Sequence, residues 1–307
     1  MADETATTWS LFEEPYWLDC VAPGTWHAVE LKREGQIIGR LPYVIKRRYG
    51  VSAISTPWFT PWLGPWIRPS GGKQARELSH QHEVLTALIK GLPKVQRTLI
   101  ACAPEFHNLM AFHWAGYNLK VGYTHRLTSL GDEQALWAGM RDTARNKCRK
   151  AEKATAVNTG RSIGDFISIL QKTFHRQGKD FSASFPVLER IDDAMRARNQ
   201  RALYCVEDAK GRIHAARYVA FDERHCFSLA AGGDPELRDS GADALATWHA
   251  IKDAGKRSRI FDFLGSMIRP IEIFVRDFGP SQVPRFSATR SSRWLKIFEA
   301  LGGRFRG

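Results

Sequence analysis

Apolar and polar residues alternate with the two-residue period of a β-strand in several short segments of this chain. Residues 27–32 and 37–45 predict two strands joined by a turn at Glu34-Gly35-Gln36. Pro42 inside the second segment cannot donate to a strand ladder, so it indicates an edge or a bulge. The other elements expected in this half are helices at 73–92 and 106–114 and strands at 98–101 and 117–127.

The second half of the chain alternates between helical and strand periodicity. A long helix is predicted over 132–154, because Leu136, Met140, Ala144 and Cys148 recur on one face. The elements expected after it are helices at 163–177 and 186–199, three consecutive strands at 202–208, 213–221 and 225–231, a helix at 240–254, a strand at 260–263 and a helix at 271–278. The pattern therefore predicts an α/β protein with mixed sheets.

The first half shows a looser version of the same order of elements, which indicates an internal structural duplication. The polar segment Asn158-Thr159-Gly160 is the expected boundary. This predicts an N-terminal domain over residues 1–157 and a C-terminal domain over residues 158–307. A length of 307 residues suits two domains of ordinary size.

Composition narrows the setting in which the chain works. The net charge of +13 favours an anionic partner such as a nucleic acid, a nucleotide-linked substrate or an acidic membrane surface, although it also fits a merely basic surface. Five cysteines at long spacings, with no CxxC pair, argue against a disulfide framework and against a structural zinc site. The acidic start MADETA predicts no signal peptide, and no apolar stretch approaches the roughly 18 residues of a membrane span. A cytoplasmic protein with no metal site is expected.

Residues 56–66 form an unusual segment with three prolines and three tryptophans, including Trp58 and Trp62. Such a segment fits neither a helix interior nor a central strand. Its rigid backbone and large aromatic faces suit the wall of a substrate-binding pocket, and a hydrophobic plug between domains is the equal alternative.

The helix expected over 132–154 carries a basic run, with Arg145, Lys147, Arg149 and Lys150 within six residues. Most runs of this kind are solvated helix faces. Together with the net charge, this one favours a surface that follows nucleic-acid phosphates.

The order of elements in the second half is similar to that of the GNAT acyltransferase fold. In that fold, a loop at a helix N-terminus holds the pyrophosphate of coenzyme A, and the family pattern has Arg or Gln, two residues, Gly, one residue, and Gly or Ala. Here the matching residues 238–243 read RDSGAD, in which Arg238 and Gly241 fit and Asp243 does not. Two aspartates in the loop disfavour an anion, and a helix start capped by Ser240 or Asp239 is the simpler interpretation.

Residues 261–267 (FDFLGSM), followed by IEIF at 271–274 and Phe278-Gly279, resemble the C-terminal signature of the Fem-like branch of that superfamily. The segment TFHRQG at 173–178 resembles another pattern of the branch. Many Fem-like proteins have two GNAT-like domains and move an amino acid from an aminoacyl-tRNA onto an amine. The members that branch peptidoglycan usually carry a long helical hairpin, which this sequence lacks; the resemblance thus implies a smaller, peptide-like acceptor.

The candidate site residues follow from this resemblance and from the chemistry. Attack of an amine on an ester requires a neutral amine, a positioned acyl carbon and a stabilised oxyanion. Asp262 and Glu272 are the candidate catalytic groups, although Asp262 also fits a buried partner of an arginine, and Glu272 fits a helix start with Arg276 as its ion-pair partner. The candidate substrate contacts are Trp58, Trp62, Arg176, Phe263, Gly265, Ser266 and Met267.

Three functions remain open from the sequence. The first is an aminoacyl-tRNA-dependent transferase that forms an amide on a small peptide or peptide-like amine, with Arg145, Lys147, Arg149 and Lys150 on the tRNA. The second is an N-acyltransferase that uses acyl-coenzyme A or an acyl-carrier protein. The third is a non-catalytic RNA-binding module, which is disfavoured because the aromatic residues cluster with prolines and not with the basic run. No cofactor beyond the donor substrate is expected.

Overall fold

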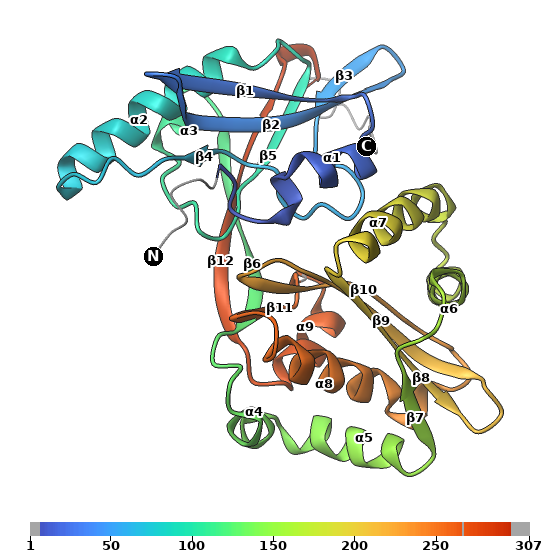
Figure 1. Ribbon diagram of the computed structural model, residues 1–307. Coiled ribbons are helices and arrows are strands. Elements are labelled where there is room, and N and C mark those ends of the chain that lie inside the picture. The colour runs from blue at the N-terminus through green and yellow to red at the C-terminus, as the bar shows by residue number, and fades with distance from the viewer. Residues whose placement is uncertain (1–6, 266, 296–307) are drawn as a thin grey trace. The chain divides into compact units, whose positions relative to one another are not determined.

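The computed structural model describes residues 7–265 and 267–295. The chain forms two compact units (Figure 1): unit 1 contains the described residues up to 122 and from 284 onward, and unit 2 contains residues 123–283. The chain passes between the units within β6 (Asn118–Leu127) and within β12 (Ser281–Ser291). The boundary expected between residues 157 and 158 falls inside β7 (Thr155–Asn158) of unit 2.

Unit 1 combines a mixed sheet with short and long helices. Its strands are hydrogen-bonded in the order β1-β2-β3-β5-β12, β4 pairs with β2, and only the β3–β5 pair among these described registers is parallel. The strands are β1 (Trp26–Arg33), β2 (Gln36–Arg48), β3 (Val51–Ile54), β4 (Trp66–Ile67) and β5 (Arg97–Ala101). The helices are the 3-10 turn η1 (Leu11–Glu13), α1 (Pro15–Val21), α2 (Gln74–Gly91) and α3 (Met110–Trp114).

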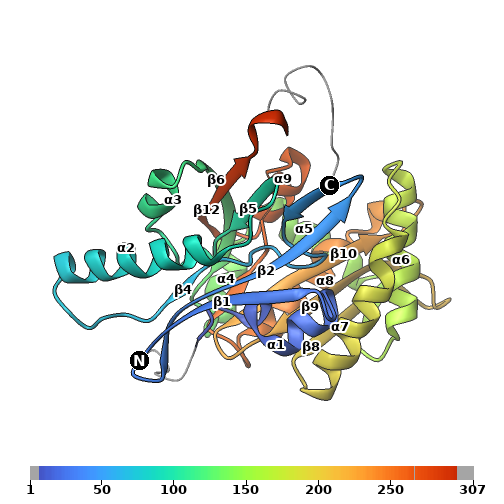
Figure 2. The ribbon, with the colours of Figure 1, turned by 90° about the horizontal axis from the view of Figure 1, so that it is seen from above.

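The predicted hairpin of unit 1 is confirmed, and α2 packs along it. β1 and β2 are antiparallel, with an irregularity at Leu31/Lys32, and Pro42 lies opposite Ala28. β4 pairs with β2 before Pro42, and β3 pairs with β2 after it. Pro42 itself pairs with neither strand, so its lack of an N–H group removes no hydrogen bond from these two ladders. Figure 2 shows α2 beside β1 and β2, and a Cβ on Gly39 would lie 2.3 Å from the Val84 side chain of that helix.

A buried carboxyl group closes the N-terminal turn of unit 1. Glu13 is 1% exposed, and its Oε2 accepts the backbone N–H groups of Trp9 at 2.7 Å and Ser10 at 3.1 Å. Arg40 donates to the backbone oxygen of Glu13 at 2.7 Å and pairs with Glu30 at 3.7 Å. Burial raises the pKa of Glu13 to about 8, against the opposing effect of these hydrogen bonds.

Replacement of Glu13 by glutamine tests this burial. The carboxyl binds its proton more tightly in the folded chain than in the unfolded one, so its contribution to stability is complete below about pH 4.5 and is lost as the pH rises through 8. We expect the melting temperature of the wild type to fall across this window more steeply than that of Glu13→Gln, with at most about 1.4 kcal/mol per pH unit at stake. The exposed control Glu83→Gln should follow the wild type; parallel curves for Glu13→Gln would contradict the assignment.

Unit 2 also has a mixed sheet, with helices on both of its faces. The strands run in the order β6-β11-β10-β9-β8-β7, and β10 and β11 are parallel. The strands not yet given are β8 (Arg201–Asp208), β9 (Ile213–Phe221), β10 (His225–Gly233) and β11 (Ile260–Asp262). The helices are α4 (Glu133–Gly139), α5 (Asp142–Glu152), α6 (Ile163–Arg176), α7 (Phe185–Ala197), α8 (Ala242–Ala254) and α9 (Arg269–Arg276), with the 3-10 turns η2 (Ser182–Ser184) and η3 (Arg238–Ser240).

The continuous apolar character of β9 is explained by burial on both faces. Tyr218 lies against Phe166 of α6, with ring centroids 5.8 Å apart. The next residue, Val219, belongs to the core cluster formed with α5 and α8. Successive side chains of a strand point to opposite faces, so α6 covers one face of this sheet and α8 the other.

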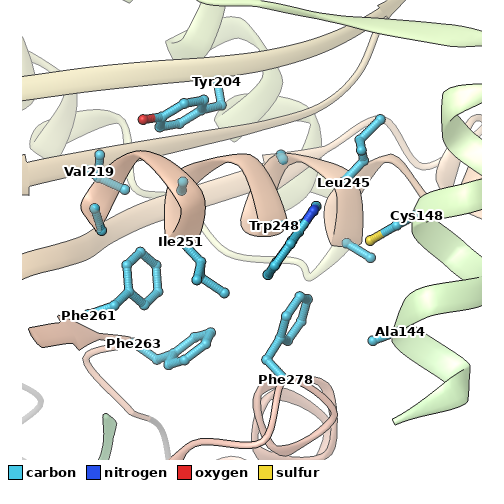
Figure 3. Close-up of a cluster of buried hydrophobic side chains, with 14 of the residues drawn as sticks. Ala144, Cys148, Tyr204, Val219, Leu245, Trp248, Ile251, Phe261, Phe263 and Phe278 are labelled. Atoms are coloured by element: carbon cyan, nitrogen blue, oxygen red, sulfur yellow. The ribbon is translucent and has the colours of Figure 1, made fainter. Parts of the chain in front are cut away.

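The core of unit 2 lies between the sheet and α8. Figure 3 shows Trp248 and Ile251 of α8 directed toward Phe261, Phe263 and Phe278, with the α5 residues Ala144 and Cys148 beside them. Phe263 contacts Phe261 edge to face at 4.9 Å, and Phe278 lies 5.9 Å from Phe263. This core joins the end of β11 to the helices that follow it.

The single long helix expected over 132–154 is wrong, because α4 ends at Gly139 and α5 begins at Asp142. Met140 and Arg141 are extended, with ψ angles of 147° and 151°. The freed N–H of Arg141 donates to the backbone oxygen of Asp277 at 2.8 Å, while Met140 is 3% exposed in the core. Gly139 weakens the helix at this point. The burial of Met140 and the hydrogen bond of Arg141 then complete the break.

Most of the other predicted elements are confirmed, with shifted ends. The helix expected at 106–114 is shortened to α3, and the helix expected at 240–254 starts at Ala242. The elements not foreseen are η1, α1, β3, β4, β7, η2, η3 and β12. β3, β4 and β7 have two to four residues, too few for a periodic pattern, and β12 contains Pro284.

Candidate functional site

The end of β11 is held by a network around the carboxylate of Asp262. This side chain is 0% exposed and accepts hydrogen bonds from the Thr124 hydroxyl, from Arg126 Nε at 2.6 Å and from the Leu264 backbone N–H at 2.8 Å. Thr124 and Arg126 come from β6, which pairs with β11 at Arg126 and Asp262. The contacts are those of a buried arginine partner, the alternative to a catalytic role that the sequence left open.

The chain then turns sharply against β6. Leu264 has a positive φ of 51°, which is uncommon outside glycine. A Cβ on Gly265 would lie 2.7 Å from the Thr124 Cα and 2.9 Å from the Tyr123 oxygen, and the Gly265 N–H donates to the Thr124 hydroxyl at 3.1 Å. The absence of a Cβ at Gly265 thus permits a close approach to the backbone of β6.

The remaining residues of the 261–267 segment differ in surroundings. Phe263 is buried in the core at 7% exposure, whereas Met267 is 69% exposed. Ser266 lies outside the described residues. Within this predicted substrate-binding segment, only Met267 therefore presents a largely exposed side chain among the described positions.

Replacement of Asp262 by asparagine separates its two roles. The asparagine amide cannot neutralise Arg126, and its NH₂ group would face the hydrogen-bond donors that surround Asp262. We therefore expect a loss of roughly 3–5 kcal/mol in the free energy of unfolding, measured by denaturant titration. The matched surface variant Asp193→Asn, whose pair with Arg196 is exposed, should stay close to the wild type. An unchanged unfolding midpoint combined with lost turnover would instead make Asp262 a catalytic group.

Helix α9 carries the second candidate carboxylate. Glu272 is partly exposed and lies 3.9 Å from Arg276, one turn later. The pair matches the i,i+4 arrangement expected from the sequence. Its position in the first turn of the helix favours a negative charge, whether or not it takes part in chemistry.

The aromatic segment over 56–66 contributes mainly to the core of unit 1. Trp62 is 1% exposed, donates to the Ser10 hydroxyl at 2.9 Å and packs edge to face on Phe12 at 5.2 Å. Trp58 is 43% exposed. Trp62 therefore acts as a plug within its own unit, while Trp58 keeps part of its surface exposed.

The TFHRQG segment at the end of α6 anchors that helix to β10. The Thr173 hydroxyl donates to the Gly233 oxygen at 3.1 Å and accepts the Gly233 N–H at 2.9 Å. A Cβ on Gly232 would lie 3.1 Å from the same hydroxyl. Arg176, the predicted anion clamp of this segment, is exposed.

The backbone of β10 has one free edge beside β11. The parallel pairing ends at Phe227 and Asp262, whereas the pairing of β10 with β9 continues to Gly233. In the described residues, β10 from Ser228 onward thus has a strand on one side only. An extended peptide-like substrate fits such an edge, because its amide groups can bond to unpaired backbone groups.

The basic residues of α5 are fixed by local contacts. Arg145 pairs with Asp142 at 2.5 Å, and Lys150 donates to the Asp239 backbone oxygen at 2.6 Å. Lys147 lies 5.9 Å from the centroid of the Phe274 ring, and Arg149 lies 5.6 Å from that of Trp137. Lys147, Arg149 and Lys150 remain exposed, so all three cations are accessible to an anionic partner.

The loop over 238–243 is covered by α5. Gly241 caps α8 with a φ of 82°, and a Cβ on it would lie 2.4 Å from the backbone oxygen of Lys147. The Ser240 hydroxyl accepts the Ala242 N–H at 3.4 Å, and Asp243 Oδ1 accepts the Ala244 N–H at 2.8 Å. The chain's own acceptors thus occupy places that a bound pyrophosphate would take.

Arg217 is a buried charge that the sequence analysis missed. It lies in β9, is 8% exposed and donates to the Ser228 hydroxyl. Burial lowers its pKa to about 10. The signal available in the sequence was an arginine in the middle of the otherwise apolar strand over 213–221.

The described residues contain neither a cluster of metal ligands nor a membrane-spanning helix. Across residues 7–265 and 267–295, no three His, Cys, Asp or Glu side chains are grouped to hold a metal ion. Over the same residues, no helix has the length and apolar character needed to cross a membrane.

Residues 138–267 match the model of the acetyltransferase (GNAT) domain family. A comparison with curated proteins finds no match to this chain. The fold is similar to the crystal structure of FemX, with a TM-score of 0.68 and 13% identity over 95% of this chain and 94% of that one.

Two further structures have a similar fold. The tandem GNAT protein from the clavulanic acid biosynthesis pathway has a TM-score of 0.53 and 10% identity, over 90% of this chain and 86% of that one. L-PGS from Bacillus licheniformis has a TM-score of 0.52 and 11% identity, over 93% and 90%. The prediction of an α/β fold with mixed sheets is confirmed. Residues 138–267 are an acyltransferase domain of the GNAT superfamily, and the chain as a whole has the fold of FemX.

Proposed function

We propose that this chain transfers an aminoacyl group from an aminoacyl-tRNA to the amine of a small peptide or peptide-like acceptor. The observation that carries the proposal is the likeness to FemX, which extends over nearly the full length of both chains. The acyltransferase domain supports the reaction class, and the Fem-like sequence segments support the donor. Because charged tRNA is found in the cytoplasm, the reaction takes place there.

The surface of α5 supports a nucleic-acid donor. Three exposed cations lie on this helix within four residues, and the buried face of the helix holds them against the core of unit 2. Phosphate contacts by lysine and arginine supply sequence-independent affinity for RNA. The backbone edge of β10 and the turn after Asp262 are the elements proposed to hold the acyl group, with Phe263 and Gly265 shaping that wall from within and Met267 contacting the substrate.

Direct attack of the acceptor amine on the ester suits the residues present. The step forms an amide bond, releases the tRNA hydroxyl and needs one proton to move from the amine to the leaving oxygen. Glu272 is the proposed carboxylate for holding the ammonium group or accepting its proton, because it is partly exposed and, among the described residues, pairs with Arg276 alone at 3.9 Å. Arg176 of unit 2, which is exposed, is a proposed contact of the acceptor. Trp58 of unit 1, also exposed, stays a predicted substrate contact.

A peptide-sized acceptor is favoured by the lengths of the helices. Within the described part of unit 2, the longest helix is α6 with 14 residues. A long helical hairpin of the peptidoglycan-branching type is not among these elements. The acceptor proposed here is therefore a free peptide or a peptide-like metabolite.

An acyl-coenzyme A or acyl-carrier donor is the second candidate, and one observation supports it. The tandem GNAT protein with a similar fold is described with reference to AcCoA. Against this donor, the α8 N-terminus is packed against the Lys147 carbonyl and carries Asp239 and Asp243 nearby. Like charges at that position disfavour a pyrophosphate.

The donor is tested by direct assay. Purified protein is incubated with a pool of charged tRNA and a panel of amine and peptide acceptors, and loss of the aminoacyl ester is followed together with amide formation. We expect acceptor-dependent ester loss above the rate of spontaneous hydrolysis. Transfer from acyl-thioesters in the absence of any transfer from charged tRNA would refute the first proposal and support the second.

The role of α5 is tested with a triple variant. Arg145→Ala, Lys147→Ala and Arg149→Ala remove three cations, so we expect weaker tRNA binding and a salt dependence whose log–log slope is shallower by roughly 2–3. The control is Arg190→Ala, Arg196→Ala and Arg198→Ala around α7, which makes the same change in net charge. Equal affinities and slopes for the two triple variants would remove α5 from the proposed tRNA surface.

A further inference from the structure

Four elements of unit 2 converge on the guanidinium group of Arg217. Arg217 extends from β9 and donates to the hydroxyl of Ser228 on β10. Its Cζ lies 6.0 Å from the ring centroid of Phe274 on α9. Lys147 of α5 approaches the same ring, with Nζ 5.9 Å from the centroid. Two cations thus lie against one aromatic side chain, and one of them also donates to a hydroxyl.

This guanidinium differs from the other buried ones in having no close carboxylate. Arg126 lies 2.6 Å from Asp262, and Arg40 lies 3.7 Å from Glu30. For Arg217, no carboxylate oxygen of the described residues lies within 4.0 Å, and Asp243 acts on it only at longer range. A buried charge whose carboxylate partner acts only at longer range is unfavourable, and a bound anion would compensate it.

The surroundings determine which anion would fit. A guanidinium offers parallel N–H donors that match the oxygens of a phosphate or a carboxylate. The Ser228 hydroxyl accepts from Arg217 and keeps its own proton for donation to a ligand. With Lys147 as a second cation nearby, the site suits a doubly charged group better than a single carboxylate.

The position of the site links it to the acyl donor. Ser228 is the first residue of β10 beyond its pairing with β11, where the free backbone edge begins. The same face of β9 and β10 is the one covered by α8 and α5. An anion bound to Arg217 would therefore lie next to the edge proposed to hold the acyl chain.

We propose that Arg217, Ser228 and Lys147 bind a phosphate group of the acyl donor. The identification of the ligand as part of the donor rests on the proposed function, whereas the phosphate site itself does not. Two donors carry this chemistry: the phosphodiester at the acylated end of a tRNA, and the phosphates of an acyl-coenzyme A. This site is built from side chains and differs from the backbone N–H groups of the loop over 238–243, whose Asp243 acts on Arg217 at longer range.

The first experiment uses inorganic pyrophosphate as the probe and compares the full-length chain with Arg217→Met. Methionine keeps much of the side-chain volume and removes the charge. We expect pyrophosphate to raise the melting temperature of the wild type, and its affinity, measured by calorimetry, to fall about tenfold or more in the variant. Lys210→Met, in the exposed turn between β8 and β9, makes the same charge change and should bind as the wild type does.

The melting temperature of the free variant supplies an independent readout. Without ligand, Arg217→Met should melt at or above the wild-type temperature, because it removes a buried charge that lacks a close partner. Arg126→Met is the matched control and should melt far lower, because it leaves Asp262 buried and uncompensated. A loss in Arg217→Met as large as that in Arg126→Met, or equal pyrophosphate affinity in Arg217→Met and the wild type, would overturn the phosphate site. If Arg217→Met yields no folded protein, Arg217→Lys is compared in the same binding assay. Lysine keeps the charge but lacks the parallel N–H donors of the guanidinium group, so the affinity should fall. An unchanged affinity would overturn the proposal.

Two further ligands identify the phosphate carrier. Adenosine 3′,5′-bisphosphate represents coenzyme A, and a short RNA ending in CCA represents the tRNA. A loss of RNA affinity in Arg217→Met supports both the site and the tRNA donor. A loss confined to the bisphosphate supports the site and refutes the tRNA donor. If neither ligand is weakened, the assignment to the donor is wrong.

Discussion

Unit 2 depends on one buried carboxylate, that of Asp262. It neutralises Arg126, accepts the Thr124 hydroxyl and caps the N–H of Leu264, and so joins β6, β11 and the turn that follows β11. The turn requires a positive φ at Leu264 and a residue without a Cβ at position 265. A neutral side chain at position 262 would leave a guanidinium uncompensated in a site that excludes water. The segment over 261–267, in which Asp262 was the candidate catalytic group, thus has at its centre a side chain that positions the backbone.

The same physical rule distinguishes the buried arginines. Arg40 and Arg126 have carboxylates within 4.0 Å, so their charges are balanced within the chain. Arg217 receives a hydroxyl and an aromatic ring, which orient a guanidinium without neutralising it. A buried arginine whose charge is neutralised by a nearby carboxylate has a structural role, and one without such a carboxylate indicates a binding site for an anion. Within unit 2, the contrast between Arg126 and Arg217 is the basis of the proposed anion site.

The N-terminus of α8 illustrates how a fold can keep its shape while one of its sites changes. The GNAT arrangement of β10 followed by a helix is present, with Gly241 at the helix start. The oxygen of Lys147 approaches Gly241, and Lys150 donates to the Asp239 carbonyl, so α5 occupies the surroundings of that start. A donor that depends on backbone N–H groups at this point is disfavoured, and one held by side chains of β9 and α5 is favoured.

The sequence by itself determined the fold class, most of the helices and strands, and a resemblance to Fem-like proteins. Periodicity is a local property: the two-residue alternation of β1 and β2 and the one-sided leucines of α2 are visible without any knowledge of their neighbours. It could not show the break at Met140 and Arg141, because that break is completed by a hydrogen bond to Asp277, more than a hundred residues away. The short strands β3, β4 and β7 exist only because partners pair with them.

Tertiary structure alone decided the surroundings of the candidate residues. Asp262 and Trp62 resemble functional residues in the sequence, and both prove to be buried among partners from distant segments. Arg217 resembles an ordinary strand residue, and only the arrangement of β9, β10 and α9 shows that its charge has no close counterpart. Burial and charge balance depend on all the spatial neighbours of a residue, and the sequence does not show which residues these are. The period of hydrophobic residues depends only on their order in the chain.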